Sequence, residues 1–263
     1  MGAGTVVEPY GIVLTAHYLV VGADEIRVSP LEGEPRQGHV VGIDFVTGLA
    51  AIHLEDQRLP GLEIRKVGSE VVGEEAFLIA STGEERRVAN GLVTSYAPFE
   101  TFWEYVVDHG LTCSAASAGL GGGPLIDARG QMLGVVSLSL AEVGKFTFAV
   151  PAHDASSMLT QIARDGSYTT PSPRAWLGIT CYPVGSNLIL AGALPESPAE
   201  QAGLLPGDIV VEADGAPISD RRGMYEAIWK QPPGETLRLK IRRGEEHLDV
   251  EVRASSIEVF FDA

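Results

Sequence analysis

The stretch GLGGGPLIDARGQMLGVV, residues 119–136, decides the fold. Two apolar runs, PLID and QMLGVV, flank a short polar segment, and a run of three glycines precedes them. This pattern predicts a glycine-rich turn that leads into a β-hairpin. Similar apolar runs recur about every eight to twelve residues from residue 4 to residue 150, separated by Gly, Pro, Asp or Glu clusters. That spacing indicates an all-β barrel or sandwich, and the apolar spacing over 153–163 predicts a helix that closes it.

The remainder of the chain has a different pattern. Residues 165–174 (DGSYTTPSPR) combine Gly, Ser, Thr and Pro, which favours an exposed connection. After it, apolar strand patterns alternate with two short helical patterns, SPAEQAG (197–203) and DRRGMYEAIWKQ (220–231). Ser197 suits a helix N-cap and Gly203 a helix end. We therefore predict a β domain over 1–165, a linker over 166–173, a small α+β domain over 174–255 and a tail over 256–263.

Composition excludes several classes of function. The 263 residues carry a formal net charge of -16, which would repel a nucleic-acid backbone. The two cysteines, Cys113 and Cys181, fall in different predicted domains, so we expect no disulfide framework. No Cys or His spacing suits a structural metal, and we predict no cofactor. The sequence contains no long apolar run and no basic, apolar leader, so we expect a soluble chain with no membrane segment.

Three stretches of the first domain together resemble the HtrA/Deg branch of the trypsin-like serine proteases. They are residues 2–28 (GAGTVVEPYGIVLTAHYLVVGADEIRV), 42–52 (GIDFVTGLAAI) and 119–136. The family has similar motifs in the same order, namely a GSG strand before T-N-N-H-V-V, then GxDxxTDLAVL, then GNSGGPL. The resemblance implies a trypsin-like double β-barrel with Greek-key topology, mainly β overall.

The residues that carry catalysis in that family differ in this chain. Alignment on the flanking residues places Tyr18 at the general-base histidine, Gly48 at the orienting aspartate and Gly121 at the nucleophilic serine. A glycine has no side-chain atom with which to attack, and a tyrosine is a poor proton acceptor at neutral pH. Backbone N–H groups of Gly119 and Gly121 would line the remaining oxyanion hole. We therefore predict a pseudoprotease that is not an enzyme.

Two alternatives stay open. In the first, the chain is an active serine-type endopeptidase with a relocated site, in which His17 acts with Ser114, Ser117 or Cys113. In the second, the vacated pocket binds a metal or a small ligand through His17 and Tyr18.

The second domain resembles the PDZ domains associated with such proteases. Residues 174–184 (RAWLGITCYPV), 188–220 and 232–252 follow the family's LGI motif, its GSPA-x-x-AGL-x-pGD motif and its last two strands. PDZ domains bind an extended C-terminal peptide at a sheet edge and hold its carboxylate with backbone N–H groups. By this resemblance the peptide-binding residues are the capturing loop and the facing helix: Trp176, Leu177, Gly178, Ile179, Met224 and Ile228.

The resemblance also implies partners and a compartment. We expect the PDZ groove to bind apolar C-termini or unfolded chains, for regulation, scaffolding or protein quality control. A homo-oligomer, or a hetero-oligomer with an active relative, is also expected. The family works outside the cytoplasm, in the periplasm or cell envelope, which the residues themselves do not show.

Overall fold

A computed structural model divides the chain into two compact units. The structure describes residues 1–8, 12–30, 32–54, 59–82, 85–115, 121–139 and 146–261, and only the backbone of residues 8, 82, 85, 86 and 139. The first unit comprises Met1–Phe99 and Val107–Thr170, and the second comprises Glu100–Val106 and Pro171–Ala263. The expected linker over 166–173 therefore spans the division between the units.

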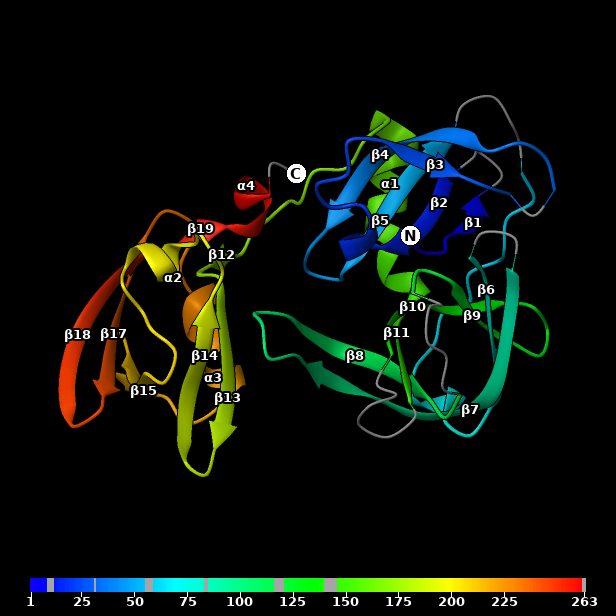
Figure 1. The fold of residues 1–263 in the computed structure, drawn as a ribbon. Coiled ribbons are helices and arrows are strands. Elements are labelled where there is room, and N and C mark those ends of the chain that lie inside the picture. Colours follow the sequence, from blue (N-terminus) through cyan, green and yellow to red (C-terminus); the bar gives the residue numbers. More distant parts are fainter. Residues whose placement is uncertain are drawn as a thin grey trace. The chain divides into compact units, whose positions relative to one another are not determined.

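The first sheet of unit 1 has five strands in the order β1-β2-β5-β4-β3 (Figure 1). Its strands are β1 (Thr5–Glu8), β2 (Ile12–Ala16), β3 (Ile26–Val28), β4 (Arg36–Asp44) and β5 (Leu49–Leu54). All five residues of β2, an interior strand of this sheet, are buried, which indicates that both of its faces are covered. Among the described residues β1 and β3 do not pair, so this sheet is open where a complete barrel would close.

The second sheet of unit 1 is a closed barrel in the order β10-β11-β8-β7-β6-β9. Its strands are β6 (Glu75–Thr82), β7 (Glu85–Glu100), β8 (Val106–Cys113), β9 (Pro124–Asp127), β10 (Met132–Ser139) and β11 (Thr147–Pro151). The predicted hairpin forms, with Met132 paired to Ile126 and Val135 to Pro124. The mainly β, trypsin-like fold predicted from the sequence is confirmed.

Short helices complete unit 1. They are η1 (His17–Leu19), η2 (Ser69–Val71), η3 (Ala152–Ala155) and α1 (Ser156–Asp165). Helix α1 buries Met158, Leu159 and Ile162 and ends at Gly166, which has a left-handed φ of 81°. The expected closing helix is therefore present, beginning as a 3-10 turn and ending two residues later than predicted.

Unit 2 is a small α+β domain around one apolar core. It contains a sheet in the order β13-β14-β15-β17-β18, with β16 paired to β15, a two-stranded sheet of β12 and β19, and the helices α2 and α3 (Figure 1). The elements are β12 (Ala175–Trp176), β13 (Ile179–Val184), β14 (Asn187–Ala193), α2 (Pro198–Gln201), β15 (Ile209–Ala213), β16 (Ala216–Pro217), α3 (Arg221–Trp229), β17 (Thr236–Arg243), β18 (Glu246–Arg253), β19 (Ser255–Ser256) and α4 (Ile257–Phe260). The predicted N-cap is correct, since Ser197 Oγ accepts a hydrogen bond from Glu200 N–H at 3.3 Å.

The segment Glu100–Val106 was not expected in unit 2. It joins β7 to β8, two strands of the barrel of unit 1, yet it belongs to the other unit. Val106 is 5% exposed and lies in the same apolar core as Leu177, Ile179 and Tyr225. Unit 2 is therefore built from two pieces of the chain that are far apart in the sequence.

Candidate functional site

The glycine turn of unit 1 packs directly against Tyr18. The phenol Oη donates a hydrogen bond to Ser137 C=O at 2.5 Å, and burial raises the pKa of Tyr18, so the hydroxyl stays protonated. A Cβ added to Gly121 would overlap Tyr18 Oη. The alignment placed these two residues at the base and nucleophile positions of the family, and the structure brings them together.

Backbone hydrogen bonds hold the residues that follow. Gly121 C=O accepts from Ala3 N–H at 2.9 Å, and Gly122 N–H donates to Val136 C=O at 2.7 Å. Gly122 has a φ of 83°, and a Cβ there would overlap Ala3 C=O and Thr15 Oγ1, so glycine is required. Gly119, the other expected oxyanion-hole residue, lies outside the described residues.

His17 and Gly48 also meet. His17 Nδ1 lies 3.0 Å from Gly48 C=O, and His17 N–H donates to the same oxygen at 2.9 Å. A carbonyl only accepts hydrogen bonds, so Nδ1 carries the ring proton and Nε2 is the basic nitrogen. Burial lowers the pKa of His17, against the Gly48 hydrogen bond and the nearby charge of Asp44, which raise it. The imidazole is therefore held in its neutral form.

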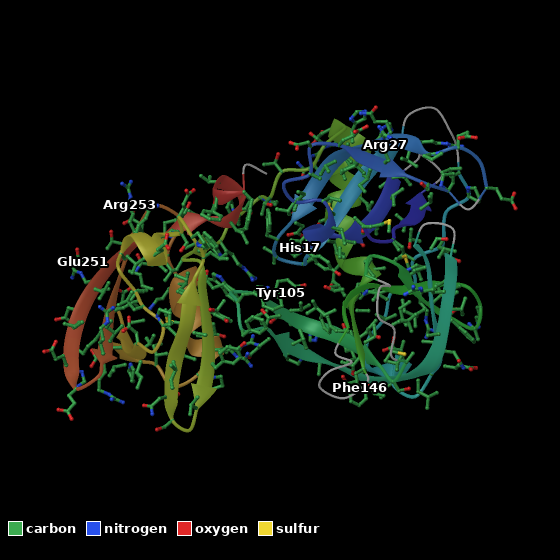
Figure 2. The ribbon with its side chains drawn as sticks, in the orientation of Figure 1. His17, Arg27, Tyr105, Phe146, Glu251 and Arg253 are labelled. Carbon is green, nitrogen blue, oxygen red and sulfur yellow. The ribbon has the colours of Figure 1, made fainter. Side chains whose placement is uncertain are left out.

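His17 and Tyr18 point to different partners. Their ring centroids are 6.1 Å apart, and the rings are nearly perpendicular at 83°. His17 contacts Phe45, with centroids 5.4 Å apart, whereas Tyr18 reaches Ser137 (Figure 2 labels His17). The two side chains thus do not converge on one ligand, and the described residues contain no group of three or more His, Cys, Asp or Glu suited to a metal ion.

The expected replacement nucleophiles differ in environment. Cys113 is fully buried in the barrel core, and burial raises the pKa of its thiol, which disfavours the reactive thiolate. Ser114 is exposed, and its Oγ accepts a hydrogen bond from Leu92 N–H at 2.9 Å. Ser117 lies outside the described residues. Among the described candidates for the nucleophile, Ser114 is therefore the residue with an exposed side chain.

The expected carboxylate-capturing loop of unit 2 contacts a carboxylate from another part of the chain. Gly178 has a φ of 81°, and a Cβ there would overlap Ser197, so only glycine fits. Leu177 N–H and Ile179 N–H both point at one carboxylate, that of Glu104, at 2.9 Å and 3.1 Å. Backbone N–H groups of such a loop form an anion-binding concavity. The loop therefore binds a carboxylate in this structure.

The other expected groove residues are buried in this structure. Met224 is 0% exposed and Ile228 is 1% exposed, and both belong to the apolar core of unit 2. Trp176 is covered by the tail, with its ring 4.5 Å from that of Phe260. Because Val106 of the segment Glu100–Val106 belongs to the same core, the place of these residues in the peptide site stays a prediction.

Sequence reasoning missed two residues at this site: Glu104, which contacts the loop, and Tyr225, which contacts the segment that carries Glu104. Tyr225, on α3, donates its hydroxyl hydrogen to Thr101 C=O at 3.1 Å. Glu104 lies within the run Phe-Trp-Glu-Tyr at 102–105, in which aromatic residues flank one acid. That composition is unusual for a hairpin tip, but nothing in the sequence connects it with a domain that begins about seventy residues later.

None of the helices in the described part of the chain is long and apolar enough to cross a membrane.

Comparison with known proteins agrees with both units. Residues 2–135 match the family model described as trypsin-like peptidase domain, and residues 175–254 match that of the PDZ domain. A probable periplasmic serine endoprotease, DegP-like, from Halomonas elongata is 28% identical over 96% of this chain and 56% of its own length. A putative serine protease HhoA from Synechocystis is 27% identical over 97% of this chain and 71% of its own length. The chain thus spans little more than half the length of several curated relatives it matches.

Solved structures show the same fold. An HtrA-type protease AlgW with a decapeptide has a TM-score of 0.59 at 22% identity and covers 97% of this chain and 82% of its own. The serine endoprotease from Yersinia pestis has a TM-score of 0.58 at 22% identity, over 97% and 89% of the two chains.

The comparisons correct one expectation. The predicted loss of the usual nucleophile, base and acid led us to expect that the chain is not an enzyme. The curated relatives are named serine endoproteases, and the similar structures are titled proteases, which points to a protease. The expectation rested on the residues at positions 18, 48 and 121 alone. It did not consider that other residues of the domain could supply the base and the nucleophile.

Proposed function

Because this chain belongs to the trypsin-like peptidase family, in its HtrA branch, and carries that branch's PDZ domain, we propose that it captures extended peptides in the groove between β13 and α3. The observation that carries the proposal is the pair of N–H groups of Leu177 and Ile179, both directed at one carboxylate. A peptide added antiparallel to β13 gains main-chain hydrogen bonds there, and its terminal carboxylate enters the loop.

The expected ligand is a peptide with an apolar C-terminal end and a free carboxylate. Half-buried and exposed aromatic side chains, such as Tyr182 on β13, border the groove and suit such residues. The similar AlgW structures are titled with a decapeptide and with a tripeptide, which supports the same kind of ligand here.

Fluorescence anisotropy on the full chain tests this function. The probes are two fluorescein-labelled decapeptides that end in Phe, one with a free carboxylate and one with a C-terminal amide. We expect the carboxylate peptide to bind at least about tenfold more tightly, because charge-assisted hydrogen bonds to the loop contribute about 1.5–3 kcal/mol. Equal affinity for both peptides would contradict the proposal.

A second candidate function is serine-type endopeptidase activity, which the names of the relatives favour. Tyr18, Gly48 and Gly121 occupy, in this proposal, the positions of the family's base, acid and nucleophile, so the activity must use other groups. The neutral His17, with its proton on Nδ1 toward Gly48 C=O, has the form of a general base. Ser114 is the candidate nucleophile with an accessible oxygen.

A peptidase assay separates the variants of this second candidate. We expect wild-type protein to cleave unfolded casein, and His17→Ala and Ser114→Ala each to reduce the rate at least about a hundredfold, since base and nucleophile act as a unit. Thr94→Ala, which changes an exposed hydroxyl on the neighbouring strand, serves as control. Cleavage that survives both active-site substitutions would exclude this pair.

The names of the periplasmic relatives support an extracytoplasmic location for this chain, and fractionation of the native host tests it. A role in protein quality control and assembly into an oligomer stay predictions, the latter measurable by light scattering.

A further inference from the structure

The groove between β13 and α3 is occupied by the segment Glu100–Val106. Cys181 N–H, on β13, donates to Phe102 C=O at 2.8 Å, and Trp103 forms an antiparallel bridge with Thr180. The segment thus adds a short strand to the edge of the sheet, in the position and direction that a PDZ peptide takes. On the opposite wall, Tyr225 Oη donates to Thr101 C=O at 3.1 Å.

The segment brings its own carboxylate to the loop. Glu104 Oε2 accepts from Leu177 N–H at 2.9 Å, and Oε1 accepts from Ile179 N–H at 3.1 Å. In an antiparallel ligand the residue that follows Trp103 is the one that reaches this loop, where a bound peptide would end. A side-chain carboxylate here does what a main-chain terminal carboxylate does in a free peptide.

Side chains outside the loop fix the segment in place. The Phe102 ring stacks on Tyr182 of β13, with centroids 5.4 Å apart and an interplanar angle of 16°. Val106 is buried in the core of unit 2, and Arg222 of α3 lies 4.0 Å from Glu100. The contacts involve both walls of the groove and both ends of the segment.

We propose that Glu100–Val106 is an internal ligand of the PDZ groove, with Glu104 in place of a peptide's terminal carboxylate, so that a free peptide binds only by displacing it. This inference rests on the proposed function of the groove. The segment is joined at both ends to strands of the peptidase-fold barrel, β7 and β8. A peptide that displaces the segment therefore also releases the tip of the β7–β8 hairpin. Peptide binding at unit 2 is in this way linked to the barrel of unit 1 through the chain itself.

The inference also defines what the groove recognises. A glutamate inside a chain, preceded by two aromatic residues, accepts hydrogen bonds from the loop, and the backbone before it pairs with the edge of β13. The ligand class therefore includes internal acidic segments as well as free C-termini, and Phe-Trp-Glu is the model sequence.

Competition measures the occupancy. The full chain, its Glu104→Ala variant and the matched control Glu245→Gln, whose carboxylate lies on the exposed β17–β18 turn, are titrated with the labelled carboxylate decapeptide. Apparent affinity falls in proportion to the open fraction of the groove, so occupancy of about 90% weakens binding about tenfold. We expect Glu104→Ala to bind at least about tenfold more tightly than wild type, and Glu245→Gln to match wild type.

A milder variant protects the test against misfolding. Phe102 is 40% exposed, so Phe102→Ala removes its stacking on Tyr182 without opening the core. We expect it to tighten peptide binding severalfold, in the same direction as Glu104→Ala. Affinities of both variants equal to that of wild type would overturn the inference.

Amide hydrogen exchange, measured by NMR without any peptide, separates this inference from the function on which it rests. The amides of Leu177, Ile179 and Cys181 should be protected in wild type and exchange at least about tenfold faster in Glu104→Ala. If no peptide binds any variant but protection is lost, the internal ligand stands and the proposed function fails. If peptides bind and protection is the same in both proteins, the function stands and the internal ligand is refuted.

Discussion

Raising the pH should open the groove. Burial raises the pKa of Glu104 from its ordinary 4.5 to about 7, although the N–H groups of Leu177, Ile179 and Gly178 act to lower it. A carboxyl group with a raised pKa in the docked state stabilises docking fully below its ordinary pKa and loses that contribution as the pH rises through about 7. The segment should therefore dock most firmly in mild acid and be displaced most readily above neutral pH.

The size of the effect follows from the two pKa values of Glu104. A difference of about 2.5 in pKa, at about 1.4 kcal/mol for every pKa unit, gives an upper limit of about 3.5 kcal/mol. Between pH of about 5.5 and about 7.5, linkage then weakens docking roughly twentyfold. The neighbouring groups Cys181 and Tyr225 do not titrate in this range, because burial raises the pKa of Cys181 to about 11 and raises that of Tyr225 further.

Anisotropy titrations across this pH range measure the effect. The apparent Kd of wild type for the carboxylate peptide should fall by up to roughly twentyfold as the pH rises, because the competing segment leaves. Glu104→Gln, whose amide does not titrate, should bind with a Kd that is nearly independent of pH. A wild-type Kd that is constant, or that rises with pH, would refute the reasoning.

Three further predictions concern stability. Gly121→Ala should destabilise unit 1 by about 1–3 kcal/mol through overlap with Tyr18, and adding Tyr18→Phe should recover part of that loss, as a double-mutant cycle in urea would show. Asp208→Ala should lower the unfolding free energy of unit 2 by about 2 kcal/mol, because it removes the buried carboxylate that Arg243 bonds at 2.7 Å; the partial exposure of Arg243 limits the loss. Hydrogen bonds lower the pKa of Asp208, although burial acts to raise it. In wild type the contribution of Asp208 should therefore fade as acid protonates it. Phe260→Ala should uncover the indole of Trp176 on β12, shift its fluorescence to longer wavelength and lower the unfolding free energy by about 1 kcal/mol. Unchanged emission would exclude the contact between Trp176 and the tail.

The strands and the fold were predictable because the local signals agree with the final packing. The apolar runs of β2, β5 and β10 are buried on both faces, so composition alone marks them as strands. Gly178 and Gly203 lie at positive φ, which explains why the PDZ motif needs glycine at both places. In these places the constraint lies within a few residues of chain.

The occupied groove was not predictable because its constraint is not local. Glu104 meets Leu177 across 73 positions of sequence, and a hairpin tip carries no pattern that names its destination. The triad positions show another limit. Local alignment predicted Tyr18 and Gly121 at two of these positions, but only the structure shows that the phenol occupies the space a side chain at 121 would need. The tautomer of His17 likewise depends on the carbonyl of Gly48, a residue on another strand connection, and its neutral form depends on burial.

The most direct test of the account is a map of the peptide site by NMR. Isotope-labelled full chain with Glu104→Ala is titrated with the carboxylate decapeptide and, separately, with its amide. The account predicts that the amide signals of Leu177, Ile179 and Cys181 shift most with the carboxylate peptide and far less with the amide. Largest shifts outside β13, α3 and this loop, or equal shifts with both peptides, would contradict it.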